Sequence, residues 1–507
     1  MSALYCCKLI REIESLGQVG LPPRTLMQRA GLVAANWAHE LVPPYSQILL
    51  LVGPGNNGGD ALEAAMRLRE RGHNITVWVL GDPSQMPADA AAAYALAQDA
   101  GLKLVQAQDG LPADHAMLLE HADLVVDGLF GIGLSRAPQG IYAQVIGALR
   151  RHVGKKVLAL DIPSGLNADT GWPLEHTSTV VATHTITFLA AKPGLYTGAG
   201  RDYTGVVRVE ELGVTPSILT SIPPNAVLNQ PARWQAELPQ RHHANHKGSH
   251  GSTAILGGVH GMAGAALLAG RAALKLGSGR VFVGLIDAPM LSCDPVQPEL
   301  MLRKAATLVQ TNLQAVVAGP GMGLDQAGLL SEAFHHPAPL LLDADALNTL
   351  ADDLDLRERL AQRQQNGLET VLTPHPLEAA RLLDDEVRNI QSDRLHAALE
   401  LARHYEAIVV LKGSGTVIAN PLGMLIVNPT GNAGLATAGT GDVLAGMIGA
   451  LLAQGMSSLG AACAGVWLHG KGADDLVAQQ GIGPLGITAS EVIDATRMSL
   501  NQLLRHE

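Results

Sequence analysis

Short apolar runs alternate with amphipathic stretches along most of the chain, and this alternation constrains the fold more than any other feature. In the first half, runs that suit strands cover residues 47–53, 74–80, 123–127, 156–161, 183–190 and 205–210. Stretches with helical spacing cover residues 24–41, 60–71, 89–100 and 139–152. Strands that alternate with helices form parallel sheets covered by helices on both faces. The sequence therefore predicts an α/β fold built from three-layer αβα domains.

A second series of strands follows a proline-rich segment. Its apolar runs cover residues 252–257, 280–285, 314–318, 339–343, 369–373, 407–412 and 424–427. The intervening residues 214–250 hold five prolines and little periodicity, which is typical of a linker. The length of 507 residues, at roughly 150 per domain, allows three domains, and large α/β domains lower that to two. We expect one domain at 1–215, a linker with the start of the second domain at 216–248, and a second domain at 249–507.

Composition narrows the class of protein. Hydrophobic residues make up 47% of the chain and charged residues 16%, so large cores can form. The net charge of −11 argues against nucleic acid, because phosphate binding relies on clustered Lys and Arg. The four cysteines show no metal or redox spacing, which suits a reducing cytoplasm. We therefore expect a soluble cytoplasmic protein that binds neither nucleic acid nor membrane.

One uncharged stretch, residues 443–470, satisfies the charge criterion for a membrane span. Repeated glycines and serines divide it into two Ala-rich pieces, so we predict two buried helices with a turn near Gly455. A histidine cluster in or beside the linker comprises His242, His243, His246 and His250. A polar loop is favoured there over a metal site, because no Cys or carboxylate lies at familiar ligand spacing.

Unusual residues in the first half gather where strands end. The strand ends read GPGNNGGD at 53–60, DGLFGIGLSR at 127–136, LDIPSGLNADTG at 160–171 and AAKPG at 190–194. Ligands of open α/β sheets bind outside the carboxyl ends of strands. Glycines there let backbone N–H groups approach a phosphate, and a helix N-terminus favours negative charge. The lack of a P-loop lysine or a G-x-G-x-x-G fingerprint weakens an NTPase or hydride dehydrogenase interpretation.

Charged residues accompany these glycines. Asp127 and Asp161 end two strands, and Lys192 follows another. Taken singly, each aspartate is compatible with helix capping. Two carboxylates, a lysine and two glycine loops at one crevice indicate an acid–base site with an anion cradle.

Together these four motifs resemble the NAD(P)HX epimerase family, over nearly the whole first half. The resemblance implies a Rossmann-like domain that interconverts the R and S forms of hydrated NADH and NADPH. It implies catalysis by Asp161 with help from Lys192, and a K⁺ ion held by Asn57, Asp127 and Ser164. The implied substrate-binding residues are Asn56, Asn57, Gly58, Gly59, Asp60, Gly131, Ile132, Gly133, Leu134, Ser135, Arg136, Ala137 and Asp161.

The second half carries KGSGT at 412–416 and AGTGD at 438–442. In AGTGD a glycine turn opens a helix, so the N–H groups of residues 439–441 are suited to hold a transferring phosphoryl group. Asp442 is placed to accept a proton from an attacking hydroxyl, with simple N-capping as the alternative.

These motifs, with HKGSHGSTAILGG, AGPGMG, LLLDADALN and LTPHPLEAARL, resemble the ribokinase-like superfamily, and more closely the ADP/ATP-dependent NAD(P)HX dehydratases. The resemblance implies phosphorylation of the C6 hydroxyl of the S-hydrate by ADP with Mg²⁺, then loss of phosphate to restore NAD(P)H and leave AMP. Asp442 would be catalytic. The implied hydrate-binding residues are Gly264, Ala265, Gly321, Gly323, His375 and Asp442. The implied nucleotide-binding residues are Lys412, Gly413, Ser414, Gly415, Thr416 and Gly441.

Two positions depart from the family pattern. Leu377 stands where Gly is common, and Met262 and Ala263 stand where an aromatic residue is common before Gly264. Family members often form homo-oligomers, so a homo-oligomer is expected here. The alternative is a ribokinase-like small-molecule kinase with a regulatory or protein-binding first domain. The sequence does not choose between NADHX and NADPHX.

Overall fold

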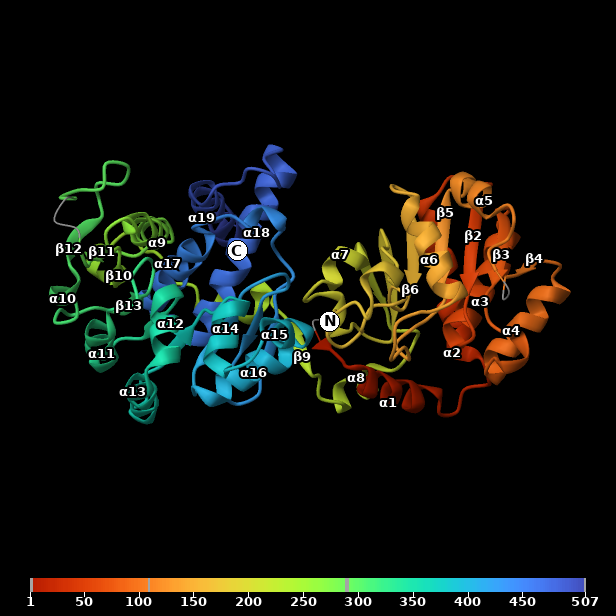
Figure 1. Ribbon diagram of the computed structural model, residues 1–507, viewed down its shortest axis with the longest axis horizontal. Helices are drawn as coiled ribbons and strands as arrows, with labels where there is room; N and C mark the ends of the chain where they lie inside the picture. The colour runs from red at the N-terminus through yellow and green to blue at the C-terminus, as the bar shows by residue number, and fades with distance from the viewer. Residues whose placement is uncertain (1–2, 108–109, 288–290, 506–507) are drawn as a thin grey trace. The chain divides into compact units, whose positions relative to one another are not determined.

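The chain forms two compact units in the computed structural model, which describes residues 3–107, 110–287 and 291–505 (Figure 1). The first unit runs from Ala3 to Ala226, and the second begins at Val227. This division falls inside the segment 216–248, for which the sequence predicts a linker and the start of the second domain. In that segment, α8 (Pro216–Ser221) belongs to the first unit, while Trp234 is only 1% exposed in the core of the second.

The first unit is built on a sheet whose strands are all parallel, in the order β4-β3-β2-β5-β6-β7-β8. Its strands are β2 (Gln47–Val52), β3 (Asn74–Val79), β4 (Lys103–Gln106), β5 (Leu124–Gly128), β6 (Val157–Leu160), β7 (His184–Phe188) and β8 (Val206–Glu210). All six strands predicted in this half are confirmed. The sequence analysis missed β4, a short edge strand.

Helices cover both faces of this sheet. They are α1 (Cys7–Gln18), α2 (Thr25–Leu41), α3 (Asn56–Glu70), α4 (Ala88–Asp99), α5 (His115–His121), α6 (Ile141–Arg151) and α7 (Gly200–Thr204). Successive strand residues point to opposite faces. Accordingly Ile48 and Leu50 pack with α1 to α4, whereas Leu49 and Leu51 pack with α5 and α6.

The second unit has a larger, mostly parallel sheet that includes the order β9-β18-β17-β16-β15-β14-β13-β10-β11-β12. Its strands are β9 (Ala226–Leu228), β10 (Ser252–Gly257), β11 (Arg280–Leu285), β12 (Met301–Lys304), β13 (Ala315–Ala318), β14 (Leu340–Leu342), β15 (Thr370–Leu372), β16 (Ile408–Leu411), β17 (Val417–Ala419) and β18 (Leu425–Val427). Only β17 runs antiparallel to both of its neighbours. The seven strands predicted here are confirmed, while β9, β12 and β17 were missed.

Helices again form two layers around the sheet (Figure 1). One face carries α9 (Ala263–Lys275), α17 (Thr440–Ala453), α18 (Ser458–Gln480) and α19 (Ala489–Arg505). The other layer holds α11 (Ala327–His335), α12 (Ala344–Asp352), α13 (Leu354–Gln365), α14 (Pro376–Leu383), α15 (Val387–Ser392) and α16 (Arg394–His404). A single turn of helix, α10 (Ala305–Leu308), follows β12. The predicted α/β class with two three-layer units is confirmed.

The uncharged stretch 443–470 contributes to two helices, as predicted. The chain leaves α17 and turns at Gly455, whose φ is +96°, before α18 begins at Ser458. Among the described residues, no helix combines the length and apolar character that a membrane crossing needs. In the histidine cluster, the His246 ring accepts a hydrogen bond from the Gly248 N–H at 3.0 Å, so this ring caps a short turn.

Small residues let α9 and α17 pack closely. A Cβ atom at Gly446 would lie 2.0 Å from the carbonyl oxygen of Ala269, which is a backbone atom and cannot move aside. Gly328 in α11 is also helical but has open space around it.

The variant Gly446→Ala should therefore lower the free energy of unfolding by about 1–3 kcal/mol, the usual cost of overpacking a core. The control Gly328→Ala should leave stability unchanged or raise it by up to about 1 kcal/mol, because alanine favours helix. Scanning calorimetry of both variants gives the comparison. Equal unfolding temperatures for the two variants would contradict this account of the α9–α17 contact.

Candidate functional sites at two sheet edges

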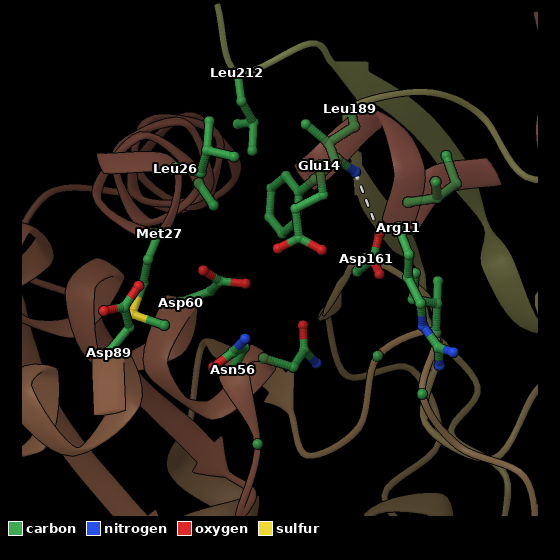
Figure 2. A pocket seen from close by; sticks show the side chains of 18 of the residues that line it. Arg11, Glu14, Leu26, Met27, Asn56, Asp60, Asp89, Asp161, Leu189 and Leu212 are labelled. Carbon is green, nitrogen blue, oxygen red and sulfur yellow. Dashed lines mark hydrogen bonds between the residues drawn. The ribbon is translucent and has the colours of Figure 1, made fainter. Parts of the chain in front are cut away.

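The order of strands in the first unit creates a crevice. From β2 the chain first adds β3 and β4 on one side, then adds β5 to β8 on the other. The carboxyl ends of β2 and β5 are therefore neighbours whose connections diverge, which is where α/β sheets bind ligands. A cavity of about 770 Å³ opens there, lined by α1 and by the loops after β2, β5 and β6 (Figure 2).

The NNGGD motif forms the first turn of α3 rather than a loop before it. The sequence placed the helix start near Asp60, but α3 begins at Asn56, with Gly55 as its N-cap. The backbone N–H groups of the motif therefore belong to the positive end of the helix. Asn56, Asn57 and Asp60 line the cavity.

The two glycines of this motif are explained by packing. A Cβ atom at Gly58 would lie 2.2 Å from the Gly53 carbonyl oxygen, and one at Gly59 would lie 2.5 Å from the Met27 methyl carbon. Both glycines are buried, and they allow the first turn of α3 to sit close to the preceding strand end and to α2. The glycine loop after β5 also lines the cavity, and every residue from Gly131 to Arg136 contributes to it. Ala137, the next residue, is not among the residues that line the cavity.

Asp161 and Lys192 form an ion pair at the edge of this cavity. Lys192 Nζ lies 2.5 Å from Asp161 Oδ1 and also donates to Thr187 Oγ1 at 2.7 Å and to the Phe188 carbonyl at 2.8 Å. These three acceptors match the three protons of the ammonium group. The Lys192 side chain is 0% exposed, whereas Asp161 lines the cavity. Lys192 therefore fixes the carboxylate from behind.

The backbone at Asp161 is unusual. Its φ is +64°, a left-handed conformation that is uncommon for a residue other than glycine. The Asp161 N–H donates to the Ile186 carbonyl at 2.7 Å, and its Oδ1 accepts from the Phe188 N–H at 3.3 Å (Figure 2). Strain of this kind persists where the surroundings fix it, and functional sites are where it concentrates.

Three predicted K⁺ ligands lie at the same strand ends. Asp127 is fully buried and accepts hydrogen bonds from the Ser164 hydroxyl at 2.7 Å and the Ser164 N–H at 2.8 Å. Burial raises the pKa of Asp127 to about 6, although the hydrogen bonds from Ser164 oppose that shift. Asn57 is also buried, and neither polar atom of its side-chain amide has a hydrogen-bond partner among the described residues.

The contribution of α1 to this cavity was not predicted from the sequence. Arg11 and Glu14 of that helix line it, alongside Asp60 and Asp161. Burial and the Asp161 carboxylate raise the pKa of Glu14. The signal was present as an amphipathic pattern, since Ile10 and Ile13 are the buried residues of the helix. Nothing in the local sequence, however, places α1 beside the ends of β5 and β6, which are over a hundred residues away.

The strand order of the second unit has a reversal of the same kind. From β10 the chain goes to β11 on one side and later to β13 on the other. Gly264 and Ala265 lie in the first turn of α9 after β10, and Gly321 and Gly323 follow β13. A Cβ atom at Gly321 would lie 3.2 Å from that of Ala265, so the structure brings these predicted residues together.

Lys412 occupies the centre of the charged group in this unit. Its Nζ lies 2.6 Å from Asp343 Oδ1 and 3.9 Å from Glu378 Oε2. Burial opposes its charge, but these carboxylates raise the pKa of Lys412 above its usual value. A Cβ atom at Gly441 would lie 3.5 Å from the same Nζ, so KGSGT and AGTGD meet at this ammonium. The sequence analysis did not single out Asp343 or Glu378.

Asp442 lies in the first turn of α17, beside that lysine. Burial, followed by the carboxylate of Asp343, raises the pKa of Asp442 to about 6. It is therefore mostly ionised at neutral pH and able to accept a proton.

His375 caps α14 with both ring nitrogens engaged. Its Nδ1 accepts from the N–H groups of Leu377 and Glu378, and its Nε2 lies 3.1 Å from Glu378 Oε1. Burial and the Lys412 ammonium lower the pKa of His375. These contacts favour an orienting role over proton donation.

Arg394 binds the backbone at the start of the KGSGT loop. Its guanidinium is buried and donates to the carbonyls of Leu411 and Lys412, both at 3.0 Å. A Cβ atom at Gly413 would lie 2.9 Å from this guanidinium, which together with a φ of +139° accounts for glycine there.

The chain matches known families over both units. A family model described as NAD(P)H-hydrate dehydratase matches residues 253–496, and one described as YjeF-related protein N-terminus matches residues 23–194. A bifunctional NAD(P)H-hydrate repair enzyme from Escherichia coli is 38% identical over 502 residues, covering 97% of this chain and 92% of its own. One from Coxiella burnetii is 36% identical over 512 residues, covering 99% and 100%.

A solved structure matches part of the chain. It is an ADP/ATP-dependent NAD(P)H-hydrate dehydratase from Bacillus subtilis, co-crystallised with ATP and Mg²⁺. Its sequence is 30% identical, its TM-score is 0.47, and the match covers 55% of this chain and 99% of that one.

The buried pair of Lys192 and Asp161 yields a prediction for stability. Replacing Lys192 by Met leaves a mostly buried carboxylate without its cation, which costs about 3–5 kcal/mol of unfolding free energy. The control Lys8→Met removes an exposed lysine of α1 and should change stability by less than about 0.5 kcal/mol. Urea unfolding of both variants measures the difference. Equal stabilities would show that Lys192 does not hold Asp161 in this way.

Proposed function

This chain belongs to the bifunctional NAD(P)H-hydrate repair enzymes, and we propose that each of its units carries one of the two reactions. Epimerisation of R- and S-NAD(P)HX takes place in the cavity of the first unit. ADP-dependent dehydration of S-NAD(P)HX takes place at the edge of the second sheet. The supporting observation is that each unit has its own strand-end aspartate paired with a lysine, Asp161 with Lys192 and Asp343 with Lys412.

In the first unit, the first turn of α3 and the loop 131–136 bind the nucleotide hydrate. Their backbone N–H groups, together with Arg136, suit its phosphates. Asp161 then contacts the reacting ring as the proton acceptor or donor. Lys192 acts through Asp161, because its ammonium is buried and fully used in positioning that carboxylate.

The residues present also fit K⁺. Such a cation takes oxygen ligands, and the unpartnered Asn57 amide, the Asp127 carboxylate and the Ser164 hydroxyl supply them. A bound cation would also offset the cost of burying the Asp127 charge. When bound, K⁺ would supply positive charge to this site, and Asn57, Asp127 and Ser164 would hold it.

In the second unit, Lys412 to Thr416 and Gly441 bind the adenine nucleotide, and Gly264, Ala265, Gly321, Gly323 and His375 surround the hydrate. Asp442 accepts the proton of the C6 hydroxyl as the terminal phosphoryl group is transferred. Phosphate then leaves far more readily than hydroxide would, and the dihydronicotinamide is restored. Lys412 neutralises charge on the phosphoryl group next to the α17 N-terminus.

The carboxylates at this edge of the second sheet fit Mg²⁺ bound with ADP. The carboxylates of Asp343 and Asp345 help raise the pKa of Asp442, so negative charge at this edge is in excess. Magnesium prefers carboxylate and phosphate oxygens, so the carboxylates of Asp343 and Asp345 would help to hold it, and it would neutralise charge on the nucleotide phosphates. The choice of ADP, the cytoplasmic location and a homo-oligomer remain predictions.

The decisive experiment uses a mixture of NADHX epimers with ADP and Mg²⁺, and follows the absorbance of the NADH formed. The wild-type chain should convert both epimers completely. Asp161→Asn should stop when the S epimer is consumed, because a missing acid–base group costs about a hundredfold to ten-thousandfold in rate. Asp442→Asn should form NADH far more slowly than the wild-type chain from either epimer.

Each variant serves as the control for the other. Asp161→Asn should still dehydrate the S epimer, and Asp442→Asn should still equilibrate the two epimers, as followed by NMR. If the wild-type chain leaves NADHX untouched and phosphorylates another alcohol instead, the small-molecule kinase becomes the correct function.

The K⁺ proposal has its own test. Replacing K⁺ in the buffer by tetramethylammonium should lower the epimerase rate and leave dehydration of the S epimer unchanged. In Ser164→Ala, which lacks the hydroxyl ligand, the K⁺ concentration for half-maximal epimerase rate should rise several-fold. An epimerase rate that ignores K⁺ in both proteins would remove the cation from the site.

A further inference from the structure

We propose that Glu14 of helix α1 is a second catalytic acid–base residue of the epimerase site, working together with Asp161. Glu14 lines the cavity with Asp161, and the two belong to elements far apart in the chain. In the view of Figure 2, the Glu14 carboxylate points into the cavity between the carboxylates of Asp60 and Asp161. The inference rests on the proposed role of Asp161.

The position of α1 is fixed by the loop that carries Asp161. Asp169 lies eight residues after Asp161 in the motif LDIPSGLNADTG. Its side chain accepts a hydrogen bond from the Cys7 N–H at 2.7 Å, at the start of the helix. Ile10 and Ile13 anchor the helix in the core, at 2% and 0% exposure. Glu14 lies one turn beyond Ile10 on the helix surface, so its carboxylate is held near the reacting centre rather than swinging in solvent.

The charges around Glu14 suit a group that alternates between protonated and ionised forms. Burial and Asp161 raise its pKa, while Lys192 and Arg11 lower it. Asp60, another carboxyl group of the cavity, differs in this respect. Burial and the carboxylates of Asp161, Glu14 and Glu63 all raise its pKa, and no cation is among the causes that act on it.

Two such groups complete an inversion at C6 of the hydrate. Glu14 donates a proton to the C6 hydroxyl, the C–O bond breaks, and water leaves with the electron pair while the N1 lone pair forms an N1=C6 double bond. A second water then adds to the other face of C6 and gives its proton to Asp161. Glu14 ends ionised and Asp161 protonated, and the opposite inversion uses the two residues with their roles exchanged.

The test uses the full chain without ADP, so that no hydrate is consumed, in water enriched in oxygen-18. In the wild-type chain every inversion should introduce one solvent oxygen. Glu14→Gln should lower inversion at least about a hundredfold. In this variant, Asp161 should still catalyse exchange of the hydroxyl of one epimer with solvent. This exchange should retain the configuration at C6 and be faster than exchange without enzyme. Asp161→Asn should lose inversion as well but exchange the other epimer.

Glu12→Gln, an exposed glutamate on the same helix, is the matched control and should behave as wild type. A Glu14→Gln variant that inverts within twofold of wild type would overturn the proposal, as would inversion without uptake of solvent oxygen. Loss of all catalysed exchange in Glu14→Gln would overturn it too, since that is the result of a merely structural role. An Asp161→Asn chain with full epimerase activity would instead refute the proposed role of Asp161.

Discussion

Each unit pairs a lysine ammonium with an aspartate at the carboxyl edge of its sheet, and both proposed sites are arranged around that charge. Lys192 holds Asp161 at 2.5 Å, and Lys412 holds Asp343 at 2.6 Å. A charge taken out of water is tolerated only when it is paired and hydrogen-bonded. The surrounding loops must therefore present carboxylates and carbonyls at fixed positions, and the same constraint orients the groups that meet the substrate.

The two lysines differ in exposure and therefore in their proposed roles. Lys192 is fully enclosed, so its effect reaches the cavity only through Asp161. Lys412 keeps 18% of its side chain exposed and lies next to Gly441, where AGTGD opens α17. A positioned carboxylate suits proton transfer to or from the oxygen bound to a ring carbon, and an accessible ammonium at a helix N-terminus suits a phosphoryl group. The chemistry proposed for each unit follows from this difference.

Much of this could be predicted from the sequence, because buried parallel strands are continuous apolar runs and their ends carry glycine and aspartate. The short strands β4, β9, β12 and β17 were not predicted. The position of Glu14 in the cavity could not be predicted, because it depends on where α1 packs against strand ends that come later in the chain. Neither could the burial of Lys192, since a lysine after a strand looks the same whether it faces a ligand or the protein interior.

The central claim is that two self-contained units carry two separate reactions on one freely exchanging substrate. Mixing the Asp161→Asn chain with the Asp442→Asn chain tests it directly, with both NADHX epimers, ADP and Mg²⁺ present. Our account predicts that the mixture converts both epimers completely to NADH, because each chain supplies the reaction that the other lacks. A mixture in which NADH formation stops at the S fraction would contradict it.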